Sequence, residues 1–255
     1  MLSRNFRLQN VGSLQWLQSN YNFSQISYSI DELIVLDVTR GERRPEEFCA
    51  ALQLITDGCF VPIAAGGGVS TIEGARNLLR AGADKIVVNS ALYQRNDFIG
   101  QLASEFGQQC VVASMDIKFS SDGGYKAWSQ AGNKCHDGSA ELWIERITQD
   151  EIGELYLNSI DRDGTGQGYD FGLLDLLPVN ITKPVILAGG VGNATHLAEG
   201  LADSRVDAVA TAHLFNFVGD GLKRARQLLI ESGVELPLWD IHLLEQHLNI
   251  KYIDS

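Results

Sequence analysis

The amino-acid sequence predicts an α/β fold, a (βα)8 TIM barrel built from two half-barrels. Short β-branched runs alternate with longer helical patterns, which is the order expected of βαβ units and a parallel sheet. The 255 residues, 45% of them hydrophobic, are enough for one large domain with a substantial core. An internal repeat relates the two halves, because the run Val61–Val69 echoes the run Lys183–Val191.

The expected strands follow one another at regular intervals along the chain. In order, they are Leu33–Val38, Val61–Ala65, Lys85–Asn89, Val111–Ile117, Glu154–Asn158, Pro184–Ala188 and Ala208–Ala212. Helical patterns occupy the intervals at Thr71–Ala81, Asn96–Phe106, Ser139–Gln149, Gly172–Leu177 and Ala194–Ala202. The turn sequence Asp122-Gly123-Gly124 interrupts this order and predicts a hairpin between Lys118–Ser120 and Tyr125–Gln130.

The first strand of an eight-stranded barrel is not found in this sequence. Under the repeat, the counterpart of Val111–Ile117 would precede Met1. Because an open barrel leaves two strand edges exposed, we expect strand one to be truncated, or improvised from Ser3–Gln9 near the seam. The barrel domain is expected to span residues 1–237, and residues 238–255 are expected to form a helical tail.

Charge and composition exclude several classes of function. The net charge of −12 opposes binding to nucleic acid or to an anionic membrane. No apolar run is long enough for a membrane span, and the N-terminus lacks the apolar stretch of a signal peptide. The cysteines Cys49, Cys59, Cys110 and Cys135 show no metal-ligand spacing, so we expect free thiols, a cytoplasmic location, no metal and no cofactor.

Two glycine runs, Gly66-Gly67-Gly68 and Gly189-Gly190, each follow a strand and precede a helix. Backbone N–H groups in such turns can approach an anion, so the pair predicts two phosphate sites. The alternative for either run alone is a tight turn that needs a positive φ. Asn89-Ser90 ends the next strand and could donate to the first phosphate, or cap a helix instead.

Carboxylates stand at the carboxyl ends of two expected strands. Asp116 follows the apolar run Val111–Met115, where partial burial would raise its pKa toward general acid–base use. The alternative is a structural Asp that caps the following loop. Asp37 occupies the same kind of position, with an orienting or a catalytic role. The polar loop Asp161–Asp170 follows another strand, so it is either part of the active site or a surface turn.

Glu32, Lys85 and Glu154 begin three different strands, so they should gather at the opposite, amino-terminal end of the barrel. A stabilising group of ion pairs is the simplest interpretation of charges at that end.

With these residues in view, the chain resembles the cyclase subunit of imidazole glycerol phosphate synthase. The most specific segments are Asp31–Asp37, Gly82–Lys85, Ser159–Thr165 and Gly168–Asp170. The resemblance implies that a glutamine amidotransferase partner forms a heterodimer with the chain and supplies ammonia. It also implies a bisphosphorylated ribulosyl substrate, which is cyclised and cleaved to imidazole glycerol phosphate and an aminoimidazole carboxamide ribotide.

The resemblance also assigns roles to individual residues. Asp116 matches one of the two catalytic aspartates, and the other belongs to the absent first strand. Substrate-orienting roles fall to Asp37, Asp163 and Thr165, a charged ammonia gate to Glu32, Lys85 and Glu154, and the partner interface to Asp84. The phosphate contacts fall on Gly67, Gly68, Asn89, Ser90, Gly164, Gly189, Gly190 and His213, although His213 stands where a small hydroxyl residue is usual.

Two other functions remain open at this point. Some relatives of the cyclase serve sugar biosynthesis and pass ammonia toward the amidation of a nucleotide sugar without cyclising anything. The segment Asn5–Gly12 resembles the loop after strand one in such relatives, and the absent first strand and His213 favour the same interpretation. A third possibility is a barrel that binds a phosphosugar and has no partner.

Overall fold

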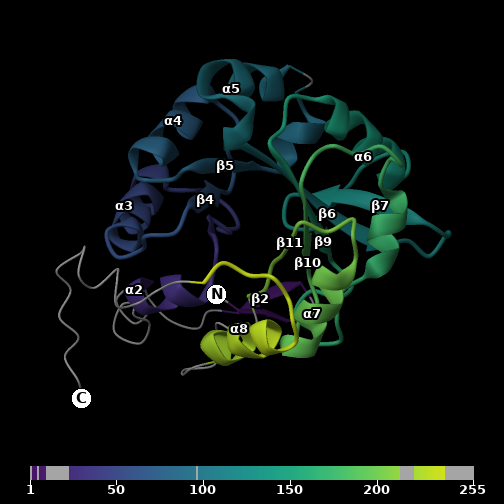
Figure 1. Ribbon diagram of the computed structural model, residues 1–255. Helices are drawn as coiled ribbons and strands as arrows, with labels where there is room; N and C mark the ends of the chain where they lie inside the picture. The colour runs from purple at the N-terminus through teal and green to yellow at the C-terminus, as the bar shows by residue number, and fades with distance from the viewer. Residues whose placement is uncertain (1, 5, 10–22, 96, 213–220, 239–255) are drawn as a thin grey trace.

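The structure is a computed structural model that describes residues 2–4, 6–9, 23–95, 97–212 and 221–238. Its centre is a curled parallel sheet inside a ring of helices (Figure 1). The neighbouring strands follow the order β11-β10-β9-β6-β5-β4-β3, and all seven expected strands are confirmed. Their bounds are β3 Leu33–Leu36, β4 Ile63–Gly66, β5 Lys85–Val88, β6 Val111–Phe119, β9 Glu154–Ser159, β10 Val185–Ala188 and β11 Ala208–Val209.

The helices lie outside the sheet and cover its convex face (Figure 1). Their bounds are α2 Phe23–Ile26, α3 Pro45–Thr56, α4 Ile72–Arg80, α5 Phe98–Phe106, α6 Ala140–Gln149, α7 Ala194–Ala202 and α8 Gly221–Glu231. The 3₁₀ turns are η1 Ser27–Ser29, η2 Ser90–Tyr93, η3 Gln108–Cys110 and η4 Phe171–Leu176. The helix expected over Gly172–Leu177 is therefore a 3₁₀ turn. Leu177 precedes Pro178 and is extended, which ends the element after a few residues.

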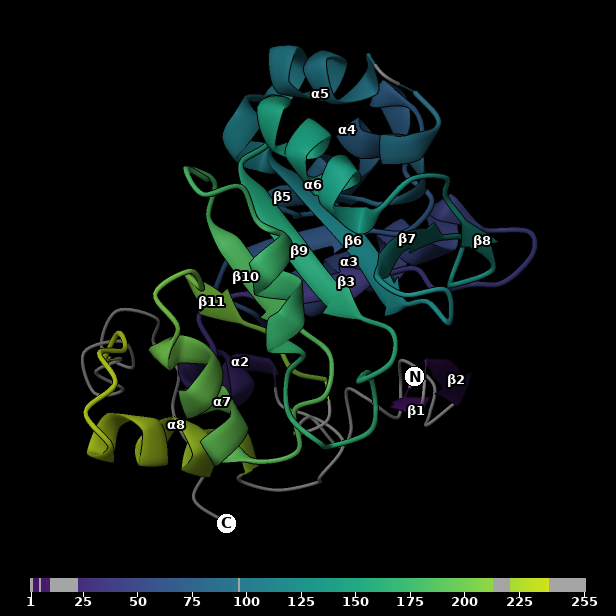
Figure 2. The ribbon, with the colours of Figure 1, turned by 90° about the vertical axis from the view of Figure 1, so that its right-hand side faces the viewer.

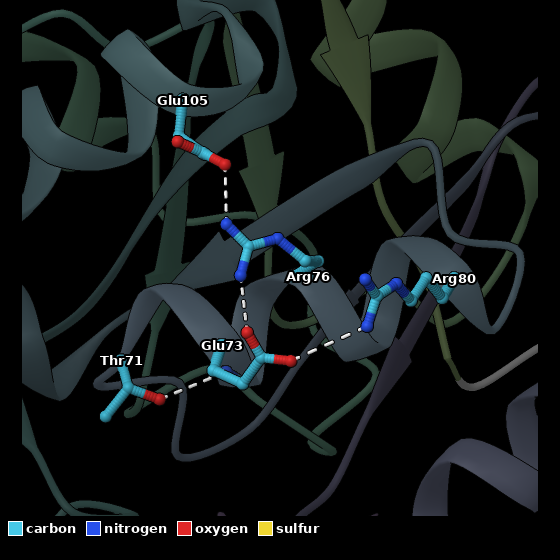
Figure 3. A network of polar contacts seen from close by, with 6 residues as sticks. Thr71, Glu73, Arg76, Arg80 and Glu105 are labelled. Carbon is cyan, nitrogen blue, oxygen red and sulfur yellow. Dashed lines mark hydrogen bonds and ion pairs between the residues drawn. The ribbon is translucent and has the colours of Figure 1, made fainter.

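Helices α4 and α5 are joined on the solvent side by an ion network (Figure 3). Arg76 pairs with Glu73 on its own helix and with Glu105 of α5, the latter at 2.5 Å. Arg80 reaches the second oxygen of Glu73 at 3.6 Å. At the start of α4, the hydroxyl of Thr71 accepts a hydrogen bond from the Gly74 N–H and so caps the helix.

Successive residues of a strand point to opposite faces of the sheet, so the apolar side chains form two clusters, one on each face. The large cluster lies between the strands and the helices and includes Ile63, Ile86, Met115 and Leu157. The small cluster lies on the concave face of the sheet. It consists of Ala64, Val87 and Val112, with Ile34 and Tyr156 packed against them.

The hairpin expected after Asp116 is confirmed. Strand β7 (Tyr125–Ser129) pairs antiparallel with the end of β6, and β8 (Lys134–Cys135) adds to its far edge (Figure 2). Gly123 and Gly124 at the turn have φ values of 88° and 93°, a region that glycine adopts without strain. The hairpin therefore extends beyond the carboxyl ends of the parallel strands.

The repeat seen in the sequence has a structural counterpart at the amino-terminal end of the strands. Oδ2 of Asp84 accepts a hydrogen bond from the N–H of Ile63 at 2.8 Å. Asp207, its repeat equivalent, accepts one from the N–H of Val185 at the same distance of 2.8 Å. Each carboxylate thus ties the beginning of one strand to the loop before its neighbour.

The expectation that Ser3–Gln9 would supply a strand near the seam is wrong for the described residues. Strands β1 (Leu2–Arg4) and β2 (Arg7–Gln9) pair only with each other, as a separate two-stranded sheet. Phe6, with φ of 58°, turns the segment back on itself, so its own backbone satisfies its hydrogen bonds. Among the described residues, the outer edges of β3 and β11 have no partner strand.

Helix α8 closes the ring on the outside of this open edge (Figure 1). Arg226 on α8 forms two hydrogen bonds, of 3.0 and 2.9 Å, with the carboxylate of Asp31, which lies just before β3. The same guanidinium donates to the carbonyl of Pro237 at 2.6 Å. A side-chain contact thus joins the last helix to the first strand of the sheet, across the edges that no described strand bridges.

Candidate functional site

Asp116 is the centre of a polar cluster at the carboxyl ends of the middle strands. Its Oδ1 accepts a hydrogen bond from the side-chain amide of Asn158 on β9 at 2.9 Å. Its Oδ2 accepts one from Asn89, the residue after β5, at 3.1 Å. Burial raises the pKa of Asp116 to about 6, the charge of Asp163 adds to this, and the two amides partly oppose it. A carboxyl group with that pKa can exchange protons near neutral pH.

The first glycine turn follows β4 and packs tightly against the end of β3. Gly67 and Gly68 have φ values of 110° and 73°. A Cβ atom on Gly67 would lie 2.2 Å from the carbonyl oxygen of Asp37, so no other residue fits without moving the backbone. Within the described chain, the N–H groups of Gly67 and Gly68 make no hydrogen bond, so both remain available to an anion.

Arg43 lies beside this turn and was not found by sequence reasoning. One of its guanidinium nitrogens would be 2.6 Å from a Cβ on Gly68, and its Nε is 3.6 Å from Oδ2 of Asp37. A guanidinium next to two open backbone N–H groups is suited to binding phosphate. Arg43 is one of several charged residues in an exposed loop, and no sequence pattern distinguishes it as a residue that contacts the glycine turn.

The second glycine turn follows β10 and meets the loop after β9. Gly189 and Gly190 have φ values of 90° and 106°. The carbonyl of Gly190 accepts a hydrogen bond from the N–H of Gly168 at 2.7 Å. His196, which sequence reasoning also missed, accepts a hydrogen bond at Nδ1 from the N–H of Gly192 at 3.1 Å. In the described chain the N–H groups of Gly189 and Gly190 have no hydrogen-bond partner.

The loop Asp161–Asp170 is held in place by contacts to the hairpin and to itself. Oδ2 of Asp161 accepts a hydrogen bond from the N–H of Phe119 at 2.8 Å. Asp170 accepts one from the hydroxyl of Tyr125 at 3.0 Å. Thr165 donates its hydroxyl to the carbonyl of Arg162 at 2.7 Å, and Gly164 has a φ of 72°. This loop is therefore ordered around the same strand ends as Asp116.

At the opposite end of the sheet, Lys85 lies between two glutamates. Its Nζ is 2.5 Å from Oε2 of Glu32 and 2.6 Å from Oε1 of Glu154. Burial raises the pKa of Glu32, and the negative charge of Glu154 raises it further. The hydrogen bond and positive charge of Lys85 lower it, but the net change is an increase. Burial lowers the pKa of Lys85. The hydrogen bonds and negative charges of the two glutamates have a larger combined effect, so the pKa of Lys85 is raised overall. The gathering of these three residues is confirmed.

The three groups on the concave face form layers along the strands. The inward residues are Lys85 and Val87 on β5, with Asn89 directly after it, and on β9 they begin with Glu154 and end with Asn158. The charged group therefore comes first, the small apolar cluster second and the Asp116 cluster last. A molecule moving through the curled sheet would meet a charged layer, then an apolar layer, then the carboxyl group of Asp116.

The remaining predicted residues have different surroundings. The side-chain amide of Asn89, a predicted phosphate contact, donates to Asp116 and to the carbonyl of Ser114. The hydroxyl of Ser90 accepts from the N–H of Gln130 at 3.4 Å. Asp84 is exposed, which is compatible with an interface. His213 and the tail from residue 239 onward lie outside the described residues.

Two other features are absent from the described residues. No group of three or more His, Cys, Asp or Glu side chains is arranged to hold a metal ion. None of the helices in this part of the chain has the length and apolar character needed to cross a bilayer.

The chain is similar to a described protein family and to a curated relative. Residues 20–219 match the family described as histidine biosynthesis protein. A relative from Parasynechococcus marenigrum (strain WH8102) is 43% identical over 241 residues, which cover 94% of this chain and 89% of the relative. That relative is named "Putative imidazole glycerol phosphate synthase subunit hisF2".

Proposed function

Because this chain belongs to the histidine biosynthesis protein family, we propose that it is the cyclase subunit of a cytoplasmic imidazole glycerol phosphate synthase. In this proposal the curled sheet is part of the family's (βα)8 barrel. A glutamine amidotransferase subunit supplies ammonia, and the chain cyclises and cleaves a bisphosphorylated ribulosyl aminoimidazole intermediate. The observation that carries the proposal is the position of Asp116, a buried carboxyl with a pKa of about 6 that lies between two glycine turns at one end of the sheet.

The two glycine turns support a substrate with a phosphate at each end. In the sheet order, β4 lies two strands from β6 on one side and β10 lies two strands from it on the other. The turns after β4 and β10 therefore stand on either side of Asp116. The open N–H groups of Gly67 and Gly68 would bind one phosphate and those of Gly189 and Gly190 the other.

Asp116 would act as the acid–base group of the cyclisation. With a pKa of about 6, it is mostly ionised at neutral pH and can accept a proton from the attacking nitrogen. It can return that proton to the departing group when the substrate is cleaved. The amides of Asn89 and Asn158 hold the carboxylate in one orientation for both steps.

The layers on the concave face support delivery of ammonia from the far end of the sheet. Lys85, Glu32 and Glu154 would form the gate at which ammonia enters. The apolar layer beyond them, with Val87 and Val112, favours neutral ammonia over the ammonium ion, because a charge crosses an apolar region only at a high energetic cost. The exposed Asp84 would lie at the partner interface on that end.

The proposal is tested by assaying the purified chain with the ribulosyl substrate and ammonium salt. We expect formation of imidazole glycerol phosphate, with at least a hundredfold lower turnover in Asp116→Asn, on the order typical of losing an acid–base group. Asp175→Asn, an exposed carboxylate paired with Arg205 on the surface, is the control and should leave turnover unchanged. No turnover by the wild-type chain would contradict the proposal.

A second candidate, an ammonia-transfer subunit that does not cyclise its ligand, is favoured by one observation. Within the described strands the only carboxylates are Asp116 and Glu154, and Glu154 begins β9 at the opposite end of the sheet. Asp163, a neighbour of Asp116, lies in a loop. Under this alternative the chain activates a glutaminase partner but produces no imidazole glycerol phosphate. Growth of a histidine auxotroph carrying this chain would exclude it.

A further inference from the structure

Trp128 lies on the same side of the hairpin as Asp116. The two residues are directly opposite each other in the antiparallel ladder between β6 and β7. Residues paired in this way project from the same face of a sheet. Ala127 and Ser129, the neighbours of Trp128 on β7, are fully buried on the other face. The indole of Trp128 is therefore presented on the face where the carboxylate of Asp116 lies.

The indole N–H of Trp128 is buried and makes no hydrogen bond within the described chain. Asp116 does not satisfy it, since its two oxygens accept from Asn158 and Asn89 instead. A buried donor without a partner is costly and uncommon in folded proteins, and it points to a group that is supplied from outside. Trp143 shows the contrast, because its indole N–H donates to the carbonyl of Asp137 at 2.8 Å.

A positively charged side chain lies close to the Trp128 ring. Nζ of Lys118, the next residue on this face of β6, lies 5.6 Å from the centre of the ring. A cation at this distance is attracted to an aromatic face and restricts the motion of the ring. The face of the hairpin next to Asp116 thus offers a flat apolar surface, one unused donor and one positive charge.

We propose that Trp128 is a substrate-binding residue, whose indole packs on the planar heterocycle of the ligand and whose N–H donates to an acceptor on that heterocycle. The inference rests on the proposed function and names the part of the substrate that this residue recognises. Strand β6 lies midway between the strands that carry the two glycine turns. A ligand held by phosphates at both ends would place its central planar group at Trp128.

A heterocycle fits this position better than a phosphate group does. Trp128 offers a single neutral donor, whereas phosphate is bound by several N–H groups or by a guanidinium, as at Gly67, Gly68 and Arg43. The carboxylate of Asp116 would also repel a dianion on this face. An aminoimidazole carboxamide has a flat ring for the indole and a carbonyl oxygen for its N–H.

The test is calorimetric titration of the intact chain with aminoimidazole carboxamide ribotide and, separately, with ribose 5-phosphate, which lacks the heterocycle. Trp128→Phe keeps a ring but loses the donor, and should weaken ribotide binding about tenfold. Trp128→Leu loses both and should weaken it further. Neither variant should change binding of ribose 5-phosphate, and Trp143→Phe, the matched control, should bind both ligands as the wild type does.

Three other results would contradict the inference. Equal ribotide affinity in Trp128→Phe, Trp128→Leu and the wild type would show that the indole does not touch the heterocycle. An equal loss for ribose 5-phosphate would show a general disturbance of the site. If the wild-type chain binds ribose 5-phosphate but not the ribotide, the proposed function fails together with this inference. Circular dichroism of each variant confirms that the comparison is made on folded protein.

Discussion

The side-chain amide of Asn158 donates a hydrogen bond of 2.9 Å to Asp116 from the adjacent strand, so the ionised form of this carboxyl is stabilised while burial opposes it. The effect of burial is the larger one, so the pKa of Asp116 rises from 3.8 to about 6. Between those two values the folded state binds more protons than the unfolded state. The free energy of unfolding contributed by Asp116 therefore decreases as the pH rises through this window.

We expect a pH-dependent difference in stability between Asp116→Asn and the wild type. The upper limit of the change, from below pH 4 to pH 7, is about 3 kcal/mol in favour of the variant, since one pKa unit corresponds to about 1.4 kcal/mol. Urea unfolding at several pH values measures it. A difference in stability that is the same at pH 4 and pH 7 would show that the Asp116 pKa is not raised by folding.

The two neighbouring glycines of the first turn should respond differently to substitution. Gly67→Ala places a Cβ against the Asp37 backbone at a φ of 110°, and should cost at least about 2 kcal/mol of unfolding free energy. Gly68→Ala has a φ of 73° and meets only the flexible end of Arg43, so about 1 kcal/mol is expected. Urea denaturation compares the two, and equal losses would contradict the described turn.

Lys85→Met tests the proposed gate. The substitution leaves Glu32 and Glu154 without their shared cation at the end where ammonia would enter. With a glutaminase partner present, we expect glutamine-driven turnover to fall about tenfold relative to turnover driven by ammonium salt. Lys183→Met is the control, because this lysine lies at the same end of the sheet and donates to the Ile152 carbonyl. An unchanged ratio in Lys85→Met would remove the gate role.

Arg226→Ala should destabilise the fold through the pair with Asp31. The change removes a bidentate contact and a hydrogen bond to Pro237, and about 1–3 kcal/mol of unfolding free energy should be lost. Arg76→Ala is the comparison, since Arg76 lies in the solvent-facing network of Figure 3, and no measurable change in Tm is expected there. An equal decrease in Tm in the two variants would show that Arg226 stabilises the fold no more than a surface arginine does.

Local patterns were sufficient to predict the parallel strands and the residues at their ends. Asp116, Lys85 and Glu154 were placed correctly because a strand has a fixed direction and a period of two, which determines both the end and the face of each residue. The hairpin after Asp116 was predictable for a similar reason, since its turn residues allow few conformations.

Residues whose positions depend on contacts between distant loops were not predictable. Arg43 reaches the first glycine turn from the loop after β3, and His196 on α7 lies against Gly168 of the loop after β9. The hydrogen bond from the Asn89 amide to Asp116 was not predicted either, because it joins side chains from two separate segments of the chain. The segment Ser3–Gln9 has a strand-like pattern, and only the positive φ of Phe6 shows that it pairs with itself.

The contact between Arg226 and Asp31 joins positions 195 residues apart, and this separation has a kinetic consequence. Closing so long a loop costs more entropy than any contact between neighbouring strands, so the pair is expected to form after the folding barrier has been crossed. Interactions that are absent from the transition state control the unfolding rate. The lifetime of the native chain, more than the speed with which it folds, should therefore depend on this one guanidinium.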